Sequence, residues 1–116
     1  MQREIIFFGT HFFDFYSEQD KKTKEKIDFV FDLIRNVDRV PIKFLKYLKG
    51  TDGLYEVKVI TQTKSLRIFC FFDEGNLIVL INGFVKKSNK TPKNEIEMGN
   101  QLKREYFIEK ARKKMK

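Results

Sequence analysis

Three apolar segments separated by short turns dominate the second half of this 116-residue sequence. They span residues 54–60, 66–72 and 77–85, and each has the length and apolar content of a β-strand. Residues 62–64 make the first connection, and the turn at residues 73–76 makes the second. Because connections this short join neighbouring antiparallel strands, the pattern predicts an antiparallel meander.

A strand and a helix are predicted before the meander. Residues 3–8 read as a short strand that lies beside the later sheet, and residues 11–13 follow it as an aromatic turn. Ser17, with Asp20 three residues later, is a helix-start signal. Apolar residues then recur at helical spacing, which predicts one amphipathic helix over about residues 18–37.

Two further helical segments are expected on either side of the meander. Pro41 permits a short helical turn over residues 44–48. Thr91 followed by Pro92 is typical of an N-cap and a first helical position, so a C-terminal helix is expected to begin there. We expect residues 107–116 to be a basic tail that frays at its end.

These elements predict an α+β fold with a small, twisted, mainly antiparallel sheet of about four strands. An N-terminal helix or helical hairpin and a C-terminal helix accompany the sheet. The segment 77–85 is apolar on both faces, as expected of a strand at the centre of a sheet that is covered on two sides. A chain this short buries one modest core, so we expect one domain over residues 1–116.

Composition indicates a folded cytoplasmic protein. Apolar residues make up 41% of the chain and 13 residues are Phe, which is ample material for a core. Neither an apolar run of bilayer length nor a signal peptide is evident, so no membrane association is expected. Cys70 is the single cysteine and lies in an apolar segment, where we interpret it as a core residue.

The positive charge is concentrated in the C-terminal third. The whole chain carries +8, but residues 1–85 hold 13 basic and 12 acidic side chains and are nearly neutral. Residues 86–93 contain four lysines without an acid, and residues 103–116 contain seven basic side chains against two glutamates. Such a distribution favours a polyanionic partner, either nucleic acid or an acidic protein segment. A solvated basic tail is the alternative interpretation.

Metal and phosphate-loop chemistry are poorly supported. His11 is the only histidine, and no group of Cys, His, Asp or Glu has metal-ligand spacing. Glycine-rich phosphate loops are also absent. A zinc or other metal enzyme is therefore not expected.

Arg67 is the most informative local feature of the predicted sheet. Strand alternation places it on the same face as Phe69 and Phe71, so it is a charge among aromatic side chains. A partly buried guanidinium requires an anionic partner, and the scissile phosphate of a nucleic acid would be one. An internal pair with Glu56 or Asp73 is an equally good interpretation of the same pattern.

Lysines accompany Arg67 in the sequence. Lys58 lies on the first meander strand, and Lys86, Lys87 and Lys90 follow the third, so strand pairing gathers these cations. The lysine-rich segment 86–93 also comes just before the predicted C-terminal helix, and the N-terminus of a helix favours anions. Taken alone, however, Lys58 reads as an ordinary strand lysine and the loop lysines as surface residues that confer solubility.

The order of elements and several specific segments resemble the RelE/ParE toxin superfamily. Residues 53–59 resemble its strand entering the meander, and residues 66–72 resemble its arginine-bearing strand. The segment at 82–92 closely resembles the HGF-x-KK-x-x-K-TP signature of the HigB-like, phage-derived branch. Its sequence is Asn82-Gly83-Phe84-Val85-Lys86-Lys87-Ser88-Asn89-Lys90-Thr91-Pro92. The resemblance is strong after Gly53 and weaker before it.

The resemblance implies a RelE-like fold and a metal-independent, ribosome-dependent endoribonuclease that inhibits translation and needs no cofactor. Its partners would be mRNA, the ribosome and a cognate antitoxin, typically a helix-turn-helix DNA-binding protein, in a toxin–antitoxin hetero-oligomer. Arg67 would stabilise charge, and Lys58 and Lys87 would place the phosphate or transfer protons. RNA-backbone binding would fall to three further lysines: Lys86, Lys90 and Lys93.

One position departs from the signature, because Asn82 stands where the branch usually has histidine. An amide cannot exchange protons near neutral pH as imidazole can. Either that histidine is not catalytic in the branch, or this chain is impaired. The superfamily that the sequence resembles also contains gyrase-poisoning members on the same fold, and fold alone does not decide function. Two alternatives are therefore kept: a gyrase-poisoning, ParE-like toxin without nuclease activity, and an inactive prophage remnant that only binds antitoxin.

Overall fold

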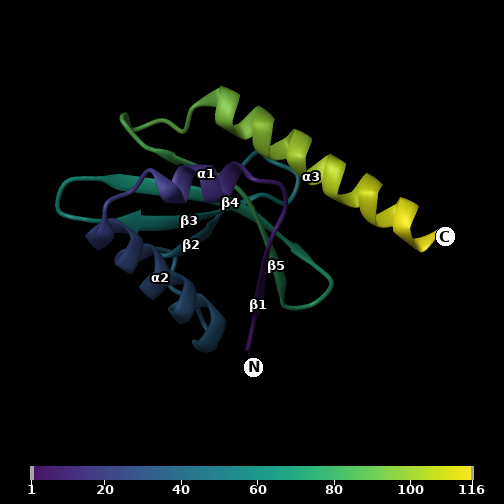
Figure 1. The fold of residues 1–116 in the computed structure, drawn as a ribbon, viewed down its shortest axis with the longest axis horizontal. Helices are drawn as coiled ribbons and strands as arrows, with labels where there is room; N and C mark the ends of the chain where they lie inside the picture. The colour runs from purple at the N-terminus through teal and green to yellow at the C-terminus, as the bar shows by residue number, and fades with distance from the viewer. Residues whose placement is uncertain (1, 116) are drawn as a thin grey trace.

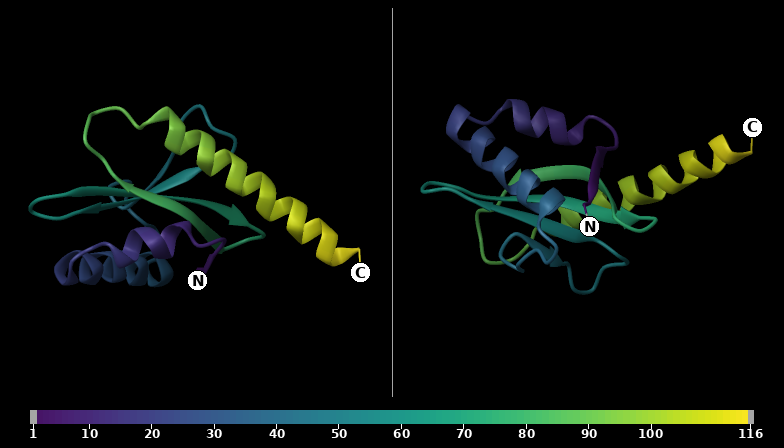
Figure 2. Two further views of the ribbon diagram at one scale, coloured as in Figure 1. Left: turned by 45° about the horizontal axis from the view of Figure 1, so that its top comes forward. Right: turned by 90° about the horizontal axis from the view of Figure 1, so that it is seen from below.

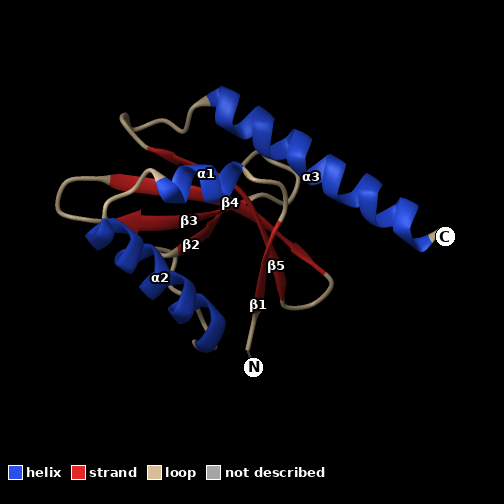
Figure 3. Ribbon diagram, in the orientation of Figure 1, coloured by secondary structure: helices blue, strands red, loops and turns tan. Residues whose placement is uncertain are grey.

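In the computed structural model, which describes residues 2–115, a five-stranded sheet separates two layers of helices (Figure 1). Figure 3 distinguishes the strands from the helices that flank them. The elements in chain order are β1 (Glu4–Phe7), α1 (His11–Ser17), α2 (Lys21–Asn36), β2 (Leu45–Tyr47), β3 (Tyr55–Ile60), β4 (Ser65–Asp73), β5 (Leu77–Val85) and α3 (Lys93–Lys114).

The sheet is mixed and has the strand order β1-β5-β4-β3-β2. Strands β2 to β5 pair antiparallel, which confirms the predicted meander, whereas β1 joins β5 in parallel. The predicted α+β class is therefore confirmed, but the sheet has five strands rather than about four. The central strand is β4, not β5 as predicted, because β1 and β5 lie on one side of it and β3 and β2 on the other.

The additional strand, β2, lies where the sequence predicts a helical turn. Leu45 pairs with Val57 and Tyr47 with Tyr55, and the amide of Leu48 donates to the carbonyl of Leu54 at 2.8 Å. A short apolar segment does not distinguish a helical turn from a strand by its periodicity. The exposed edge of β3 decides the outcome, because its backbone groups gain hydrogen-bond partners when residues 45–47 are extended.

Helices cover both faces of the sheet, as Figure 2 shows. α1 and α2 pack on one face, over a core that includes Ile27, Val30 and Ile34 of α2. α3 packs on the other face, over a second core. Alternation along β4 supplies both cores, since Ile68 and Cys70 face α1 and α2 whereas Phe69 and Phe71 face α3. The side of the sheet that α3 covers is called the α3 face below.

The helix boundaries differ in detail from the predicted ones. Residues 11–17 form the helix α1 rather than an aromatic turn. α2 begins later than expected because Asp20, not Ser17, is its N-cap and accepts a hydrogen bond from the amide of Thr23 at 2.8 Å. Pro92 is the N-cap of α3, one residue later than predicted. This helix continues to Lys114, through most of the segment expected to be a basic tail.

Cys70 is buried in the core, as predicted, and burial raises the pKa of its thiol well above the ordinary value. Among residues 2–115, no group of three or more His, Cys, Asp or Glu side chains is arranged to hold a metal ion. Every helix in the same residues is too short or too polar to cross a bilayer.

Candidate functional site

The central strands bring Arg67 and Lys58 together on the α3 face. In the register of the sheet, Arg67 of β4 pairs with Lys58 of β3 on one side and with Phe84 of β5 on the other. Only 8% of Arg67 is exposed, and the aromatic side chains of Phe69 and Phe84 lie on the same face. The predicted setting of a charge among aromatic rings is therefore confirmed.

The guanidinium of Arg67 is held by its own strand. Its Nη1 donates to Ser65 Oγ at 2.8 Å and to the carbonyl of Leu66 at 3.0 Å. Its Nε lies 3.8 Å from Glu56 Oε2, which is an ion pair without a hydrogen bond. Glu56 is thus the internal anion anticipated as an alternative partner. Asp73, the other candidate, is bound elsewhere, to Lys110 and Tyr106.

A hollow of about 340 Å³ opens beside Arg67. The loop after β5 forms its second wall, and the amide of Lys86 donates to the carbonyl of Ser65 at 2.7 Å, which fixes the start of that loop against β4. None of the lining residues is acidic. They are Ser65, Arg67, Lys86, Lys87, Ser88 and Asn89. We call this feature the cationic hollow; its side chains can donate to an anion but offer it no like charge.

The predicted site residues separate into two groups. Arg67, Lys86 and Lys87 line the cationic hollow together. Lys58 lies beside them, paired with Arg67 in the sheet. The remaining two, Lys90 in the loop and Lys93 at the start of α3, are exposed and do not line the hollow.

Lys58 has an altered proton affinity. Burial lowers the pKa of its ammonium group, and the nearby charge of Lys46 lowers it further. Glu56 opposes this effect by raising the pKa, whereas Arg67 and Lys86 add to the lowering. An amine with a lowered pKa loses its proton more readily, so Lys58 has the electrostatic setting of a proton-transfer group.

Lys46 and Glu56 are members of this cluster that sequence reasoning did not assign to a site. They face each other across β2 and β3. Their proximity depends on β2 being a strand, and the sequence prediction made that segment helical. The apolar segment over residues 44–48 was the only signal available, and it does not give the register.

Asn82 occupies a bulge in β5. Between the pairs Ile68–Gly83 and Cys70–Leu80, β4 has only Phe69 whereas β5 has both Ile81 and Asn82. The Asn82 side chain is buried and turned toward α3, where its Nδ2 donates to Glu95 Oε1 at 3.1 Å and to the Glu95 carbonyl at 3.3 Å. The residue therefore attaches the first turn of α3 to the sheet.

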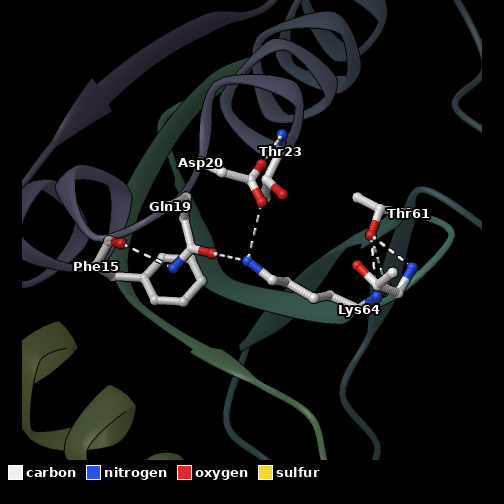
Figure 4. A network of polar contacts seen from close by, with 7 residues as sticks. Phe15, Gln19, Asp20, Thr23, Thr61 and Lys64 are labelled. Carbon is white, nitrogen blue, oxygen red and sulfur yellow. Dashed lines mark hydrogen bonds and ion pairs between the residues drawn. The ribbon is translucent and has the colours of Figure 1, made fainter.

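A polar network holds the start of β4, the strand that carries Arg67. Figure 4 shows Lys64, just before β4, reaching the corner between α1 and α2. Lys64 Nζ lies 3.5 Å from both Gln19 Oε1 and Asp20 Oδ2, while its backbone bonds to Thr61 close the β3–β4 turn. This network fixes the position of Ser65, which in turn holds the Arg67 guanidinium.

The protein is a small α+β protein with a hollow for an anion on one face of its sheet. A family model described as "Phage derived protein Gp49-like (DUF891)" matches residues 14–104, from α1 to the middle of α3. The chain belongs to this Gp49-like, phage-derived family, which is part of the RelE/HigB-like toxin family. A comparison with curated proteins finds no match.

Proposed function

We propose that this protein is the toxin of a type II toxin–antitoxin system and cleaves mRNA on the ribosome in the cytoplasm. Within the RelE/HigB-like family we assign it to the HigB-like branch, with a RelE-like fold formed by residues 1–116 as one domain. One observation carries the proposal: the buried Arg67 lies in a hollow whose other charged lining residues are lysines. A phosphate is the ligand that such a set of donors fits.

The proposed reaction is an internal transesterification of RNA. The 2′-oxygen attacks the adjacent phosphorus, the bond from phosphorus to the 5′-oxygen breaks, and the products carry a 2′,3′-cyclic phosphate and a 5′-hydroxyl. The 2′ proton passes to a base, and the leaving 5′-oxygen takes a proton from an acid. This scheme needs proton-transfer groups and cations that stabilise the phosphorane, but it needs no metal.

The residues of the hollow fit these roles. Arg67 stabilises the negative charge of the phosphorane with a planar guanidinium. Lys58, whose pKa is lowered, and Lys87, which lines the hollow, place the phosphate and transfer protons. Lys86 binds the RNA backbone at the rim, and Lys90 and Lys93 extend this contact along the loop and the start of α3.

Asn82 has no part in proton transfer in this proposal. Its amide does not titrate near neutral pH, and its Nδ2 is engaged by Glu95. The position where the branch usually has histidine therefore acts as an attachment point for α3, and the chemistry falls to the lysines of the site.

The proposed partners are mRNA, the ribosome and a cognate antitoxin with a helix-turn-helix DNA-binding domain. The antitoxin covers the cationic hollow and forms a hetero-oligomer with the toxin. In the free toxin the hollow is accessible to RNA.

Induced expression in bacteria tests this function, with growth followed and mRNA 5′ ends mapped by primer extension. We expect wild type to arrest growth and to produce new ends within translated messages. Arg67→Ala should abolish both effects, while Arg39→Ala, which removes an exposed arginine outside the hollow, should abolish neither. Growth arrest with intact messages and damaged DNA would identify a gyrase poison instead, and unimpaired growth would identify an inactive remnant.

A further inference from the structure

The Arg67–Glu56 pair is incompletely bonded. Within residues 2–115, three buried side-chain polar atoms have no hydrogen-bond partner, namely Glu56 Oε2, Arg67 Nε and Asn82 Oδ1. The first two face each other at 3.8 Å, and the side chains are only 6% and 10% exposed. Buried polar groups are nearly always hydrogen-bonded, so two opposed and unbonded atoms in one pair require an explanation.

The geometry of the strands accounts for the gap. A bonded guanidinium–carboxylate pair closes to about 2.8 Å between nitrogen and oxygen. Here Nη1 of Arg67 already donates to Ser65 Oγ and to the Leu66 carbonyl, which holds the guanidinium toward the start of β4. Glu56 is fixed opposite Phe69, two positions along the register from the Lys58–Arg67 pair. The carboxylate therefore attracts the guanidinium without bonding it.

Glu56 also offsets the repulsion among the cations that surround it. Lys46 lies opposite it on β2, Lys58 follows two residues later on β3, and Arg67 is its diagonal neighbour on β4. With the carboxylate absent, these three cations would repel one another on a partly buried surface. Glu56 thus allows the cations to stay close together before RNA arrives.

We propose that Glu56 is a positioning residue for the reaction: its carboxylate faces the buried Nε of Arg67 and holds the guanidinium on the floor of the cationic hollow, where Arg67 meets the RNA phosphate. This inference rests on the proposed ribonuclease function and deepens it. Glu56 does not touch the scissile bond. It acts through Arg67, and it also repels the incoming phosphate, because both are anionic.

This arrangement predicts opposite effects on binding and on chemistry. Glu56→Gln keeps the size of the side chain but removes its charge, so the phosphate loses a repulsive neighbour and binds more tightly. The guanidinium loses its alignment at the same time, and misplacement of a group that stabilises the transition state slows the chemical step. KM should therefore fall or stay constant while kcat falls.

Two readouts test the proposal on the whole protein. The first is the ¹⁵N–¹H resonance of Arg67 Nε, followed as inorganic phosphate is added to wild type, Glu56→Gln and Glu56→Asp. In wild type we expect a phosphate-dependent shift of this resonance. In Glu56→Gln the resonance should move even without phosphate and its N–H should exchange faster with water, while the apparent phosphate affinity should rise; Glu56→Asp should behave more like wild type.

The second readout is cleavage of mRNA on programmed ribosomes. We expect Glu56→Gln to lower kcat by at least about tenfold without raising KM, and Glu56→Asp to recover part of the loss. Glu97→Gln, which changes an exposed carboxylate of α3, is the matched control and should leave both constants unchanged.

The outcomes separate this inference from the proposed function. An Arg67 resonance and a phosphate affinity that do not change in Glu56→Gln would overturn the positioning role, whether or not the protein cleaves RNA. Loss of the acidic limb of the pH–rate profile in Glu56→Gln, with the Arg67 resonance unmoved, would also overturn it and would make Glu56 a proton-transfer group. A wild-type protein that cleaves no message would refute the nuclease, while the resonance experiment would still decide the Glu56–Arg67 relationship.

Discussion

Lys110 of α3 and Asp73 at the end of β4 form an ion pair, with Nζ 2.8 Å from Oδ2. The hydroxyl of Tyr106 donates to the same carboxylate oxygen at 2.7 Å. Asp73 is only 5% exposed, so this network attaches the C-terminal half of α3 to the sheet. The hydrogen bond from Lys110 is the main cause that lowers the pKa of Asp73, although burial opposes it.

This ion pair predicts a stability that depends on pH. Because the pKa of Asp73 is lowered on folding, its contribution is fully present above the ordinary value of 3.8 and is lost as the pH falls through the lower folded value. Asp73→Asn should cost roughly 1–3 kcal/mol in the free energy of unfolding at neutral pH. Urea titrations between neutral and acidic pH measure both effects.

The matched control for Asp73 is Asp32→Asn, which removes an exposed partner of Arg35 on α2. A surface pair of this kind contributes little, so its removal should change stability by less than about 1 kcal/mol. Equal losses in the two variants, or a difference between Asp73→Asn and wild type that persists undiminished at low pH, would show that the Asp73 network does not hold α3.

Asn82 should matter for stability rather than for proton transfer. Asn82→Ala removes the buried donor to two partly buried acceptors of Glu95, so we expect a loss of about 1–3 kcal/mol in the free energy of unfolding. Gln101→Ala, at an exposed position of α3, is the control and should be nearly neutral. If Asn82→Ala were as stable as wild type but inactive, Asn82 would be a residue of the reaction.

Gly83 should be intolerant of a side chain. A Cβ atom at this position would lie 2.6 Å from Cδ2 and 3.1 Å from Cγ of Phe15, which is closer than carbon atoms approach. Gly83→Ala therefore has to displace α1 or the strand, and such overpacking costs about 1–3 kcal/mol. Thermal unfolding measures the loss; a melting temperature equal to that of wild type would mean that Phe15 moves aside freely.

The cleavage rate should rise with pH as Lys58 loses its proton. Its pKa is lowered by burial first and by Lys46 second, so removal of the Lys46 charge should raise that pKa. If the neutral amine of Lys58 accepts the 2′ proton, Lys46→Met should move the rising limb of the pH–rate profile to higher pH and lower the rate at neutral pH. Lys58→Met should reduce kcat by about 10²–10⁴-fold.

The control for this experiment is Lys22→Met, which removes an exposed lysine at the start of α2. It should leave the profile in place. If Lys46→Met also leaves the pH–rate profile unchanged, Lys58 does not transfer the proton, and its role is limited to placing the phosphate.

Much of the sheet could be predicted from the sequence because its signals are local. The meander follows from short turns between apolar segments, and the shared face of Arg67 and Phe69 follows from the two-residue period of a strand. The same period places Lys58 and Glu56 together on β3. These relationships need no knowledge of how distant segments pair.

What the sequence does not contain is long-range register. β2 was missed because residues 44–48 suit a helical turn as well as a strand, and only the free edge of β3 favours the extended form. The Lys46–Glu56 pairing was therefore missed as well. The bulge at Asn82 depends on β4 and β5 together, so neither strand predicts it alone.

Ribosomes programmed with a defined mRNA, on which the cleavage position has been mapped, show whether the purified protein cuts RNA through its 2′-oxygen. The message is made twice, with an ordinary ribose and with a single 2′-deoxyribose at the nucleotide whose 2′-oxygen would attack. We predict that wild type cuts only the first message and leaves a 2′,3′-cyclic phosphate, and that Arg67→Ala cuts neither. Cleavage of the deoxy message would exclude attack by the 2′-oxygen, and no cleavage of either message by wild type would refute the proposed nuclease.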